Sequence, residues 1–533
     1  MFKTSMAKFG LALLVLAITA GSFPAHAQDI SPDTIKALQA QINALQKQLE
    51  ELKAAQAESA AKAAQAEAAS KTAAAAPAPG APGKTALIQP EGRGTLKVGD
   101  RVKVTVGGFV EAASVYRSKN EVADIGSNFN TGIPFDLTGA SKKGAENPLA
   151  HQSEFRETAR QSRITALVEA KATEHTLVSG YLESDFLGAA QTANSNESNS
   201  YNPRLRVFYG TVDESNCGLH FLAGQEWSLL TTDKIGIIPR QENIPLTIDA
   251  QYVPGFNWTR NPQIRIAKDF CDQKFWLAVS AESPQAVLTG IGTPPGFING
   301  SNAGGAEFDK TNNFTSDVAP DIIAKAAFDP GYGHYEIFGV TRFFHDYVLA
   351  AGAPANAALG NNDAVGFSGG AGVILPVIPK ILDLQGNFMA GQGVGRYGSV
   401  QLPDLAFTPQ GEVKPLTGYS AMVGAVAHPC PTLDTYLYAG YEGVNRENFV
   451  TTVAEAPSIG YGDFNLPIGE QQSSQVWQIT GGVWDRIYEG NFGKVQIGAQ
   501  YSFTNREAFS NSFGVAQHAN ENIFMTSFRF YPL

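Results

Sequence analysis

The chain has 533 residues, more than one ordinary domain needs, and only 17% of them are charged. Its formal net charge of −11, with no dense run of Lys and Arg, excludes a nucleic-acid partner, because phosphates are neutralised by a basic patch. Glycine (54), phenylalanine (32) and tyrosine (17) are plentiful, which favours one large architecture with many turns and an aromatic exterior.

Residues 1–27 have the three parts of a secretory signal peptide. Lys3 and Lys8 precede an apolar core over residues 11–20, and Ala25-His26-Ala27 matches an A-x-A cleavage site. The apolar core is too short to span a bilayer, which makes an uncleaved membrane anchor the less favoured alternative. We therefore expect the chain to be exported and cleaved.

Residues 28–70 are predicted to hold a short periplasmic α-helical coiled coil. Gaps of three and four residues alternate along one apolar seam, which consists of Ile35, Leu38, Ile42, Leu45, Leu49 and Leu52. The implied partner is another copy of the chain, and the alternative is one amphipathic helix packed on a globular domain. Residues 71–94 follow as an Ala/Pro/Gly linker.

Residues 95–533 are predicted to form the barrel, because short segments alternate between apolar and polar positions and no transmembrane-length apolar run occurs after Val102. Short connections alternate with long ones, as in an up-and-down barrel. Sixteen strands are predicted and eighteen remain an alternative. The expected strands are 102–117, 160–171, 176–188, 203–213, 218–229, 258–269, 274–283, 319–329, 333–347, 363–375, 380–392, 416–428, 433–447, 474–489, 493–504 and 519–531.

The alternation also assigns faces to individual side chains. The outward set is predicted to include Leu205, Val207, Tyr209, Leu219, Phe221, Ala223, Trp227, Phe524, Phe528 and Phe530. The fold class is thus all-β, an up-and-down transmembrane barrel of about sixteen strands behind a coiled coil. A secreted soluble sandwich protein is the alternative, although such proteins seldom keep a regular short-long rhythm over this length.

Charged side chains on the inward face are the candidates for solute contact, because a pore selects by width and by the charge of its constriction. Guanidinium groups suit carboxylates and phosphates, which predicts a preference for anions. For any single arginine, an ion pair that braces the wall is an equally good explanation. The candidates are Arg163, Arg204, Arg206, Arg240, Arg260, Arg265, Arg486, Arg529 and Glu226, and Glu169, Glu183 and Asp185 share their face.

The segment 230–257 follows the fifth predicted strand and is expected either to constrict the lumen or to cap the barrel outside. Neither a metal nor another cofactor is expected, since the histidines show no metal spacing. The three cysteines fall in breaks between apolar runs, and a bridge between Cys217 and Cys271 remains open. Two glycine-rich strings lack the strand-to-helix context of catalytic motifs, so no enzyme is expected.

The order of signal peptide, coiled coil and linker, followed by Val104-Thr-Val-Gly-Gly-Phe-Val-Glu-Ala112 and Gly224-Gln-Glu-Trp-Ser228, resembles the DcaP-like trimeric outer-membrane porins. The resemblance implies a homotrimer of barrels in the outer membrane, with the stalk in the periplasm. It also implies diffusion of small anionic solutes such as dicarboxylates. The chain departs from the usual pattern at its end, Phe530-Tyr531-Pro532-Leu533, where outer-membrane proteins usually end in an aromatic residue.

The sequence therefore favours a porin for small polar, anionic solutes, with further copies of itself and the lipid and lipopolysaccharide of the outer membrane as partners. A trimer conflicts with the Ile and Leu choices of the heptads, which favour two strands. A sugar-selective porin and a structural envelope tether with a closed barrel are the alternatives, and peptidoglycan is an open partner of the stalk.

Overall fold

The computed structural model describes residues 88–92, 94–139, 143–188, 202–288, 317–348, 360–409, 411–450 and 458–532. The predicted signal peptide, the coiled coil and most of the linker lie outside these residues. The last part of the predicted linker forms strand β1 (Ile88–Gly92), which pairs with β2 (Thr95–Val98). Strand β2 in turn pairs with the beginning of β3 (Val102–Arg117).

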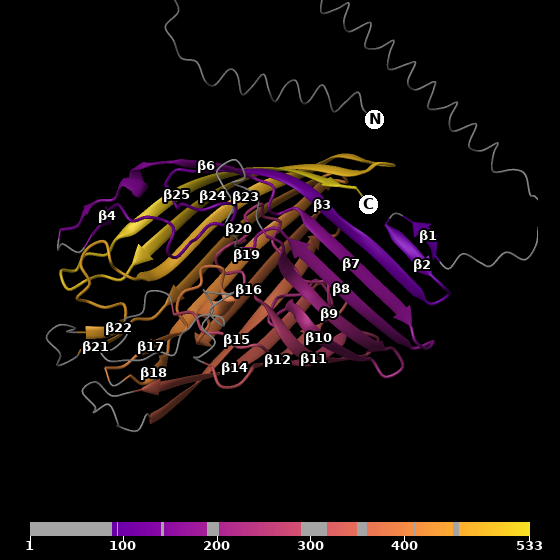
Figure 1. The fold of residues 1–533 in the computed structure, drawn as a ribbon, viewed down its shortest axis with the longest axis horizontal. Coiled ribbons are helices and arrows are strands. Elements are labelled where there is room, and N and C mark those ends of the chain that lie inside the picture. The colour runs from indigo at the N-terminus through magenta and orange to yellow at the C-terminus, as the bar shows by residue number, and fades with distance from the viewer. Residues whose placement is uncertain are drawn as a thin grey trace, which may run out of the picture. The chain divides into compact units, whose positions relative to one another are not determined.

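Sixteen antiparallel strands form a closed barrel, because each pairs with the next and the last pairs with the first (Figure 1). In chain order they are β3, β7 (Arg163–Lys171), β8 (Thr176–Asp185), β9 (Arg204–Glu214), β10 (Leu219–Trp227), β11 (Arg260–Phe270), β12 (Phe275–Glu282), β13 (Asp321–Phe328), β14 (His334–Val348), β15 (Gly360–Ile378), β16 (Leu382–Gln392), β19 (Thr417–Cys430), β20 (Leu433–Val444), β23 (Ser473–Gly490), β24 (Gly493–Ala508) and β25 (His518–Tyr531). Closure leaves no open edge, which a sheet in lipid could not tolerate.

The predicted all-β barrel and its sixteen strands are confirmed. Strand β3 has the predicted bounds, and in Figure 1 it lies in indigo beside the yellow β25, with which it closes the ring. Tight turns join the strands at one end, for example between β19 and β20, whereas long connections join them at the other. The short and long connections that alternate along the sequence therefore lie at opposite ends of the barrel.

Short strands and helices lie within the long loops at one end of the barrel. Strand β6 (Glu154–Thr158) pairs with the last residues of β3, whereas β7 pairs with the first residues of β3. Strands β6 and β7 thus lie one after the other along the same side of β3. The remaining pairs are β4 (Leu137–Thr138) with β5 (Ala145–Glu146), β17 (Leu405–Phe407) with β18 (Val413–Pro415), and β21 (Glu447–Val450) with β22 (Ser458–Tyr461), and the short helices are η1 (Pro148–His151) and η5 (Gly395–Tyr397). In the described part of the chain, no helix has the length and apolar character to cross a membrane.

The barrel exposes apolar side chains on its outer face and buries their neighbours inside. On β25, Phe524 and Phe528 are exposed, whereas Met525 and Ser527 between them are buried. The same alternation places Leu219 and Phe221 outside on β10. These outward predictions are confirmed, and a two-residue period of this kind is what lipid outside and a packed or wet lumen inside require.

Three of the predicted outward residues are instead buried inside. On β9 the pairing with β8 shifts between Glu183 and Ser184, which leaves Arg206 as an extra residue, and the bulge turns Val207 and Tyr209 inward. Phe208 takes the outward place, with 58% of its surface exposed. Trp227 was also predicted to face outward.

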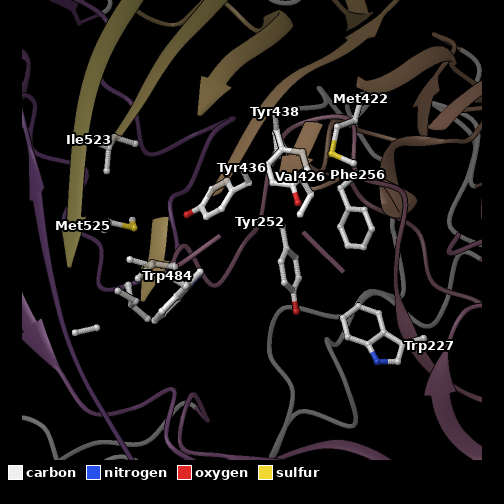
Figure 2. Packing of buried hydrophobic residues seen from close by; sticks show 14 of the residues in the cluster. Trp227, Tyr252, Phe256, Met422, Val426, Tyr436, Tyr438, Trp484, Ile523 and Met525 are labelled. Carbon is white, nitrogen blue, oxygen red and sulfur yellow. The ribbon is translucent and has the colours of Figure 1, made fainter. Parts of the chain in front are cut away.

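Trp227 is buried because β10 ends at this residue and its ring packs on the connection that follows. Its ring centroid lies 6.1 Å from that of Tyr252 and 5.7 Å from that of Trp258. The apolar core of the protein accordingly lies within the barrel. Figure 2 shows Tyr252 and Phe256 among side chains of the wall, including Met422 and Tyr438.

The cysteines lie where the sequence places breaks between strands. Cys217 and Cys271 are in tight turns, and Cys430 ends β19. All three are free and exposed, so the bridge between Cys217 and Cys271 that the sequence left open is not formed in this structure.

Candidate functional site

The connection between β10 and β11, residues 228–259, folds into the barrel, and we call it the inner loop. Its backbone reaches three strands across the interior: the amide of Ile248 donates to Gln500 Oε1 (2.6 Å), Trp484 Nε1 donates to the Leu246 carbonyl (2.7 Å), and Gly255 donates to Glu442 Oε1 (2.7 Å). Of the two positions that the sequence allowed, the loop therefore takes the one inside the lumen.

The base of the inner loop is held by a buried charge network. Lys325 Nζ on β13 lies 2.8 Å from Asp233 of the loop and 2.7 Å from Glu336 on β14. His334 extends the network, because its two ring nitrogens lie within hydrogen-bond distance of Asp329 and Glu336. These side chains are removed from water, and their charges and hydrogen bonds are satisfied by one another. The network therefore holds this part of the loop against the wall.

Two residues of the inner loop adopt a left-handed backbone although they are not glycine. Arg240 has φ 69° and Tyr252 has φ 68°. Each such residue costs roughly 1–2 kcal/mol, so surrounding contacts must hold the loop in this shape. Arg240 is held by Tyr209, whose hydroxyl accepts from its Nη1 (3.2 Å), and by its own amide, which donates to Glu242 (3.1 Å).

A cavity of about 390 Å³ remains between the inner loop and the opposite wall. Charged groups of both signs and several aromatic rings line it. The basic residues are Arg163, Arg206, Lys234, Arg240 and Arg529, the acidic ones are Glu183, Glu226, Glu242, Asp249 and Asp434, and the aromatic ones are Tyr181, Trp227, Tyr252, Trp484 and Tyr531. A solute inside this half of the barrel would meet these side chains.

Three of the arginines converge from different strands. Arg163 on β7 and Arg529 on β25 both lie over the ring of Phe109, at 5.2 and 4.8 Å from its centroid. Arg206 on β9 pairs with Glu183, which also lies 3.3 Å from Arg163 Nη1. One carboxylate thus serves two guanidinium groups, whereas Arg529 Nε lies 3.2 Å from Glu111 on β3. The Nε atom of Arg163 has no hydrogen-bond partner.

Three of the acidic residues of the cavity are covered and bonded to backbone amides. Glu226 is 1% exposed and accepts from the Trp227 amide (2.9 Å), and Asp249 is 2% exposed and accepts from the amides of Ser127 and Gln251. Glu242 is 8% exposed. Arg240 and Lys234, by contrast, are exposed to the cavity. Glu183 and Asp434 are partly exposed, but each is paired with an arginine. The unpaired, accessible charge of the cavity is therefore positive, although its residues carry both signs in equal number.

Burial also weakens the negative charge of the inner loop. Burial and the nearby charge of Asp233 raise the pKa of Glu242 above its usual range. Burial raises the pKa of Asp249 to about 6, because the loss of water outweighs the hydrogen bonds from Ser127 and the charge of Arg117. Both carboxyls therefore gain protons at a higher pH than exposed carboxyls do.

The structure brings together about half of the residues predicted from the sequence. Arg163, Arg206, Arg240, Arg529 and Glu226 line the cavity. Four other predicted residues are placed elsewhere. Arg204 binds Asp185 through two nitrogens, Arg486 binds Asp434, Arg265 is buried and donates to the Trp227 carbonyl, and Arg260 lies over the rings of Trp227 and Trp258.

Of the charged residues that the inner loop contributes to the cavity, only Arg240 was predicted from the sequence. Lys234, Glu242 and Asp249 carry no periodic signal, because the loop is irregular and its course depends on contacts with distant strands. The loop carries two apolar runs, Ile244-Pro245-Leu246 and Tyr252-Val253-Pro254-Gly255-Phe256, and neither shows where its charged residues point. Among the described residues, no cluster of three or more His, Cys, Asp or Glu side chains could hold a metal ion.

Solved structures with a similar fold are outer-membrane proteins. The chain is similar to the outer membrane channel DcaP of Acinetobacter baumannii, with 17% identity over 81% of this chain and 98% of that one and a TM-score of 0.53. It is more distantly similar to OprB of Pseudomonas putida at 9% identity, covering 80% of this chain and 94% of that one with a TM-score of 0.40. No family model and no curated protein matches the sequence. The likeness to DcaP supports the fold, a closed β-barrel.

Proposed function

We propose that the protein is an outer-membrane porin through which small anionic solutes, dicarboxylates among them, diffuse along the cavity beside the inner loop. The observation that carries the proposal is the unequal exposure of the charges. Arg240 and Lys234 reach the cavity, whereas Glu226, Glu242 and Asp249 are at least nine-tenths buried. A carboxylate entering the cavity meets guanidinium donors before it meets another carboxylate.

The apolar outer face supports a position in the outer membrane, with the tight turns toward the periplasm. Both strand termini of the ring, Val102 and Tyr531, lie at the end with the tight turns, which fits a stalk that precedes the barrel in the periplasm. In this proposal the stalk joins copies of the chain into a homotrimer, the wall contacts lipid and lipopolysaccharide, and peptidoglycan is a further partner of the stalk.

A sugar-selective porin is the second candidate, because five aromatic residues line the same cavity. A sugar slide needs ring faces open to the solute. Trp227, Tyr252 and Trp484 are 4%, 7% and 3% exposed, and they are packed against the inner loop and the wall. A solute in the cavity therefore meets charged side chains such as Arg240 and Lys234 more readily than it meets these three ring faces, which favours anions over neutral sugars.

Uptake into proteoliposomes tests the proposal. Vesicles that contain the purified protein should take up succinate faster than an uncharged sugar of similar size, because the accessible charge of the cavity is positive. Equal rates would support only a general porin, a faster uptake of sugar would favour the second candidate, and no uptake of either would favour a closed barrel that serves as an envelope tether.

A further inference from the structure

Arg260 lies beside Trp227, which lines the cavity, and like Arg240 it forms no ion pair with a carboxylate among the described residues. Its guanidinium lies over two indole rings, 5.2 Å from the centroid of Trp227 and 5.3 Å from that of Trp258. Its Nη1 atom is buried and has no hydrogen-bond partner. A buried cation without an anion is costly, and the rings compensate only part of that cost.

The phenol of Tyr252 in the inner loop lies beside Arg206, which also forms ion pairs with Glu183 and Asp185. Arg206 Nη2 donates to its hydroxyl oxygen at 3.3 Å. The Tyr252 ring packs on Trp258 at 5.1 Å and on Phe256 at 5.3 Å, both nearly edge to face. Figure 2 shows the Tyr252 hydroxyl on the side of the cluster that faces Trp227.

The positive charges around the Tyr252 hydroxyl oxygen favour a negative charge at that position. Burial alone raises the pKa of a phenol, yet the charges of Arg206, Arg260 and Arg163 outweigh burial and lower the pKa of Tyr252. The backbone at Tyr252 is left-handed, with φ 68°. A strained residue whose side chain reaches into a cluster of cations is typical of a functional position.

We propose that the hydroxyl of Tyr252 occupies an oxyanion site formed by Arg206 and Arg260, and that an anionic solute binds in the pore by displacing it. The inference rests on the proposed function and names the residue that sets the pore's affinity. In the empty pore the hydroxyl oxygen accepts from Arg206. When a carboxylate arrives, its two oxygens take donors from Arg206 and Arg260, and the phenol turns aside without any covalent change.

The exposed cations bring the solute to this point. Arg240, which lies over the ring of Tyr181 at 5.6 Å, and Arg163 line the same cavity as Tyr252. A solute with two carboxylates can hold Arg163 and Arg529 with one and reach Arg206 with the other. A solute with one carboxylate can be satisfied by Arg163 and Arg529 alone, so it need not displace the phenol.

The test uses full-length protein in planar bilayers and follows how succinate blocks the potassium chloride current. Tyr252→Phe keeps the ring and its packing but removes the competing oxygen. We expect succinate to bind the variant roughly tenfold more tightly, as the loss of a hydrogen bond to a charged group implies. Acetate binding should change much less.

Two further variants keep the test decisive. Tyr461→Phe removes a hydroxyl that is equally buried but donates to the Ser473 carbonyl (2.7 Å) away from the cavity, so it should leave succinate binding unchanged. In Arg260→Gln the second donor is absent, and adding Tyr252→Phe to it should give little gain, which a double-mutant cycle measures. Heat-modifiable mobility in SDS checks that each variant is folded.

The outcomes separate the inference from the proposed function. Unchanged or weaker succinate binding in folded Tyr252→Phe overturns the inference, because the hydroxyl is then either idle or itself a ligand of the solute. An equal gain in the presence and absence of Arg260 also overturns it. A wild-type pore that prefers cations contradicts the proposed function, and the inference falls with it.

Discussion

The inner loop divides the barrel interior into two parts that use the same residue types differently. Between the loop and strands β12 to β16, Arg342 is fully buried and lies 2.8 Å from Asp404 and 3.2 Å from Asp321. Along β7 to β10 and β25, on the far side of the loop, Arg163 and Arg529 line a cavity, and each lies near a single carboxylate, Glu183 at 3.3 Å and Glu111 at 3.2 Å. We call these the closed part and the open part.

Inward-facing arginines therefore have two different roles, and the groups around each arginine decide which role it has. In the closed part each cation meets carboxylates that are as deeply buried as itself, and the network holds loops to the wall. In the open part Lys234 and Arg240 are exposed to the cavity, whereas Glu226, Glu242 and Asp249 are covered. Cations in the first part should therefore affect stability, and those in the second should affect selectivity.

The largest effect is expected from breaking the closed part. Arg342→Met leaves the buried carboxylates of Asp321 and Asp404 without their cation, which should destabilise the barrel by about 3–5 kcal/mol. Unfolding in urea with the protein in detergent micelles measures this loss. If Arg342→Met unfolds like the wild type, the closed part is not held by its ion pairs.

The second effect concerns the contact between the inner loop and the wall. Gly255 has φ 86°, and a Cβ there would lie 2.0 Å from the carbonyl oxygen of Ala421 on β19. Gly255→Ala should therefore push the loop away from the closed part and change single-channel conductance by about twofold or more, since the loop sets the free width of the lumen.

Gly514→Ala is the matched control for the loop experiment. Gly514 has φ 73°, and nothing lies within 4 Å of the Cβ that alanine would add. It reports the cost of left-handed backbone alone, so its conductance should match the wild type. Equal conductance in both variants would mean that the loop does not limit the passage of ions.

The third effect concerns selectivity in the open part. Arg529→Gln removes one cation from the cavity and should lower the anion-to-cation permeability ratio by roughly threefold, as one unit of charge does in a wet site. It also removes the cation that lies 3.2 Å from the buried carboxylate of Glu111, so a smaller loss of stability should accompany the change in selectivity. Arg156→Gln is the control, because the Arg156 side chain is 48% exposed on β6 and is not part of the cavity. A change in stability without a change in selectivity would place Arg529 with the closed part.

The smallest effect is a dependence on pH. The pKa of Glu242 is above its usual range and that of Asp249 is about 6, so both are ionised at high pH and gain protons as the pH falls. Acidification removes negative charge from the inner loop, and the preference for anions should rise by roughly twofold between about pH 8 and about pH 5. Glu242→Gln should flatten this rise. A preference for anions that falls with acidification contradicts the assignment.

The strands could be predicted from the sequence, because every strand of the wall needs an apolar side chain toward lipid at every second residue. On β25 this demand alone places Phe524 and Phe528 outside and Arg529 inside. It fails at Val207, where one extra residue in the pairing of β8 and β9 reverses the face. A bulge leaves no periodic signal, since it depends on the partner strand.

The candidate site could be predicted only in part, for a related physical reason. Arg163 and Arg206 follow from strand periodicity, and both reach the cavity. The roles of Glu242 and Tyr252 depend on how the inner loop crosses the barrel, which is set by contacts with residues such as Gln500 and Glu442 hundreds of positions away. No local pattern encodes such contacts, so the structure was needed to find them.

The reversal potential of the wild-type pore in a potassium chloride gradient tests the central claim most directly. Because the accessible charge of the open part is positive, the sign of the potential should show that chloride crosses more readily than potassium. Added succinate should reduce the current by occupying the same cations. A potential of the opposite sign would contradict the account of the open part, although the barrel and its closed part would stand.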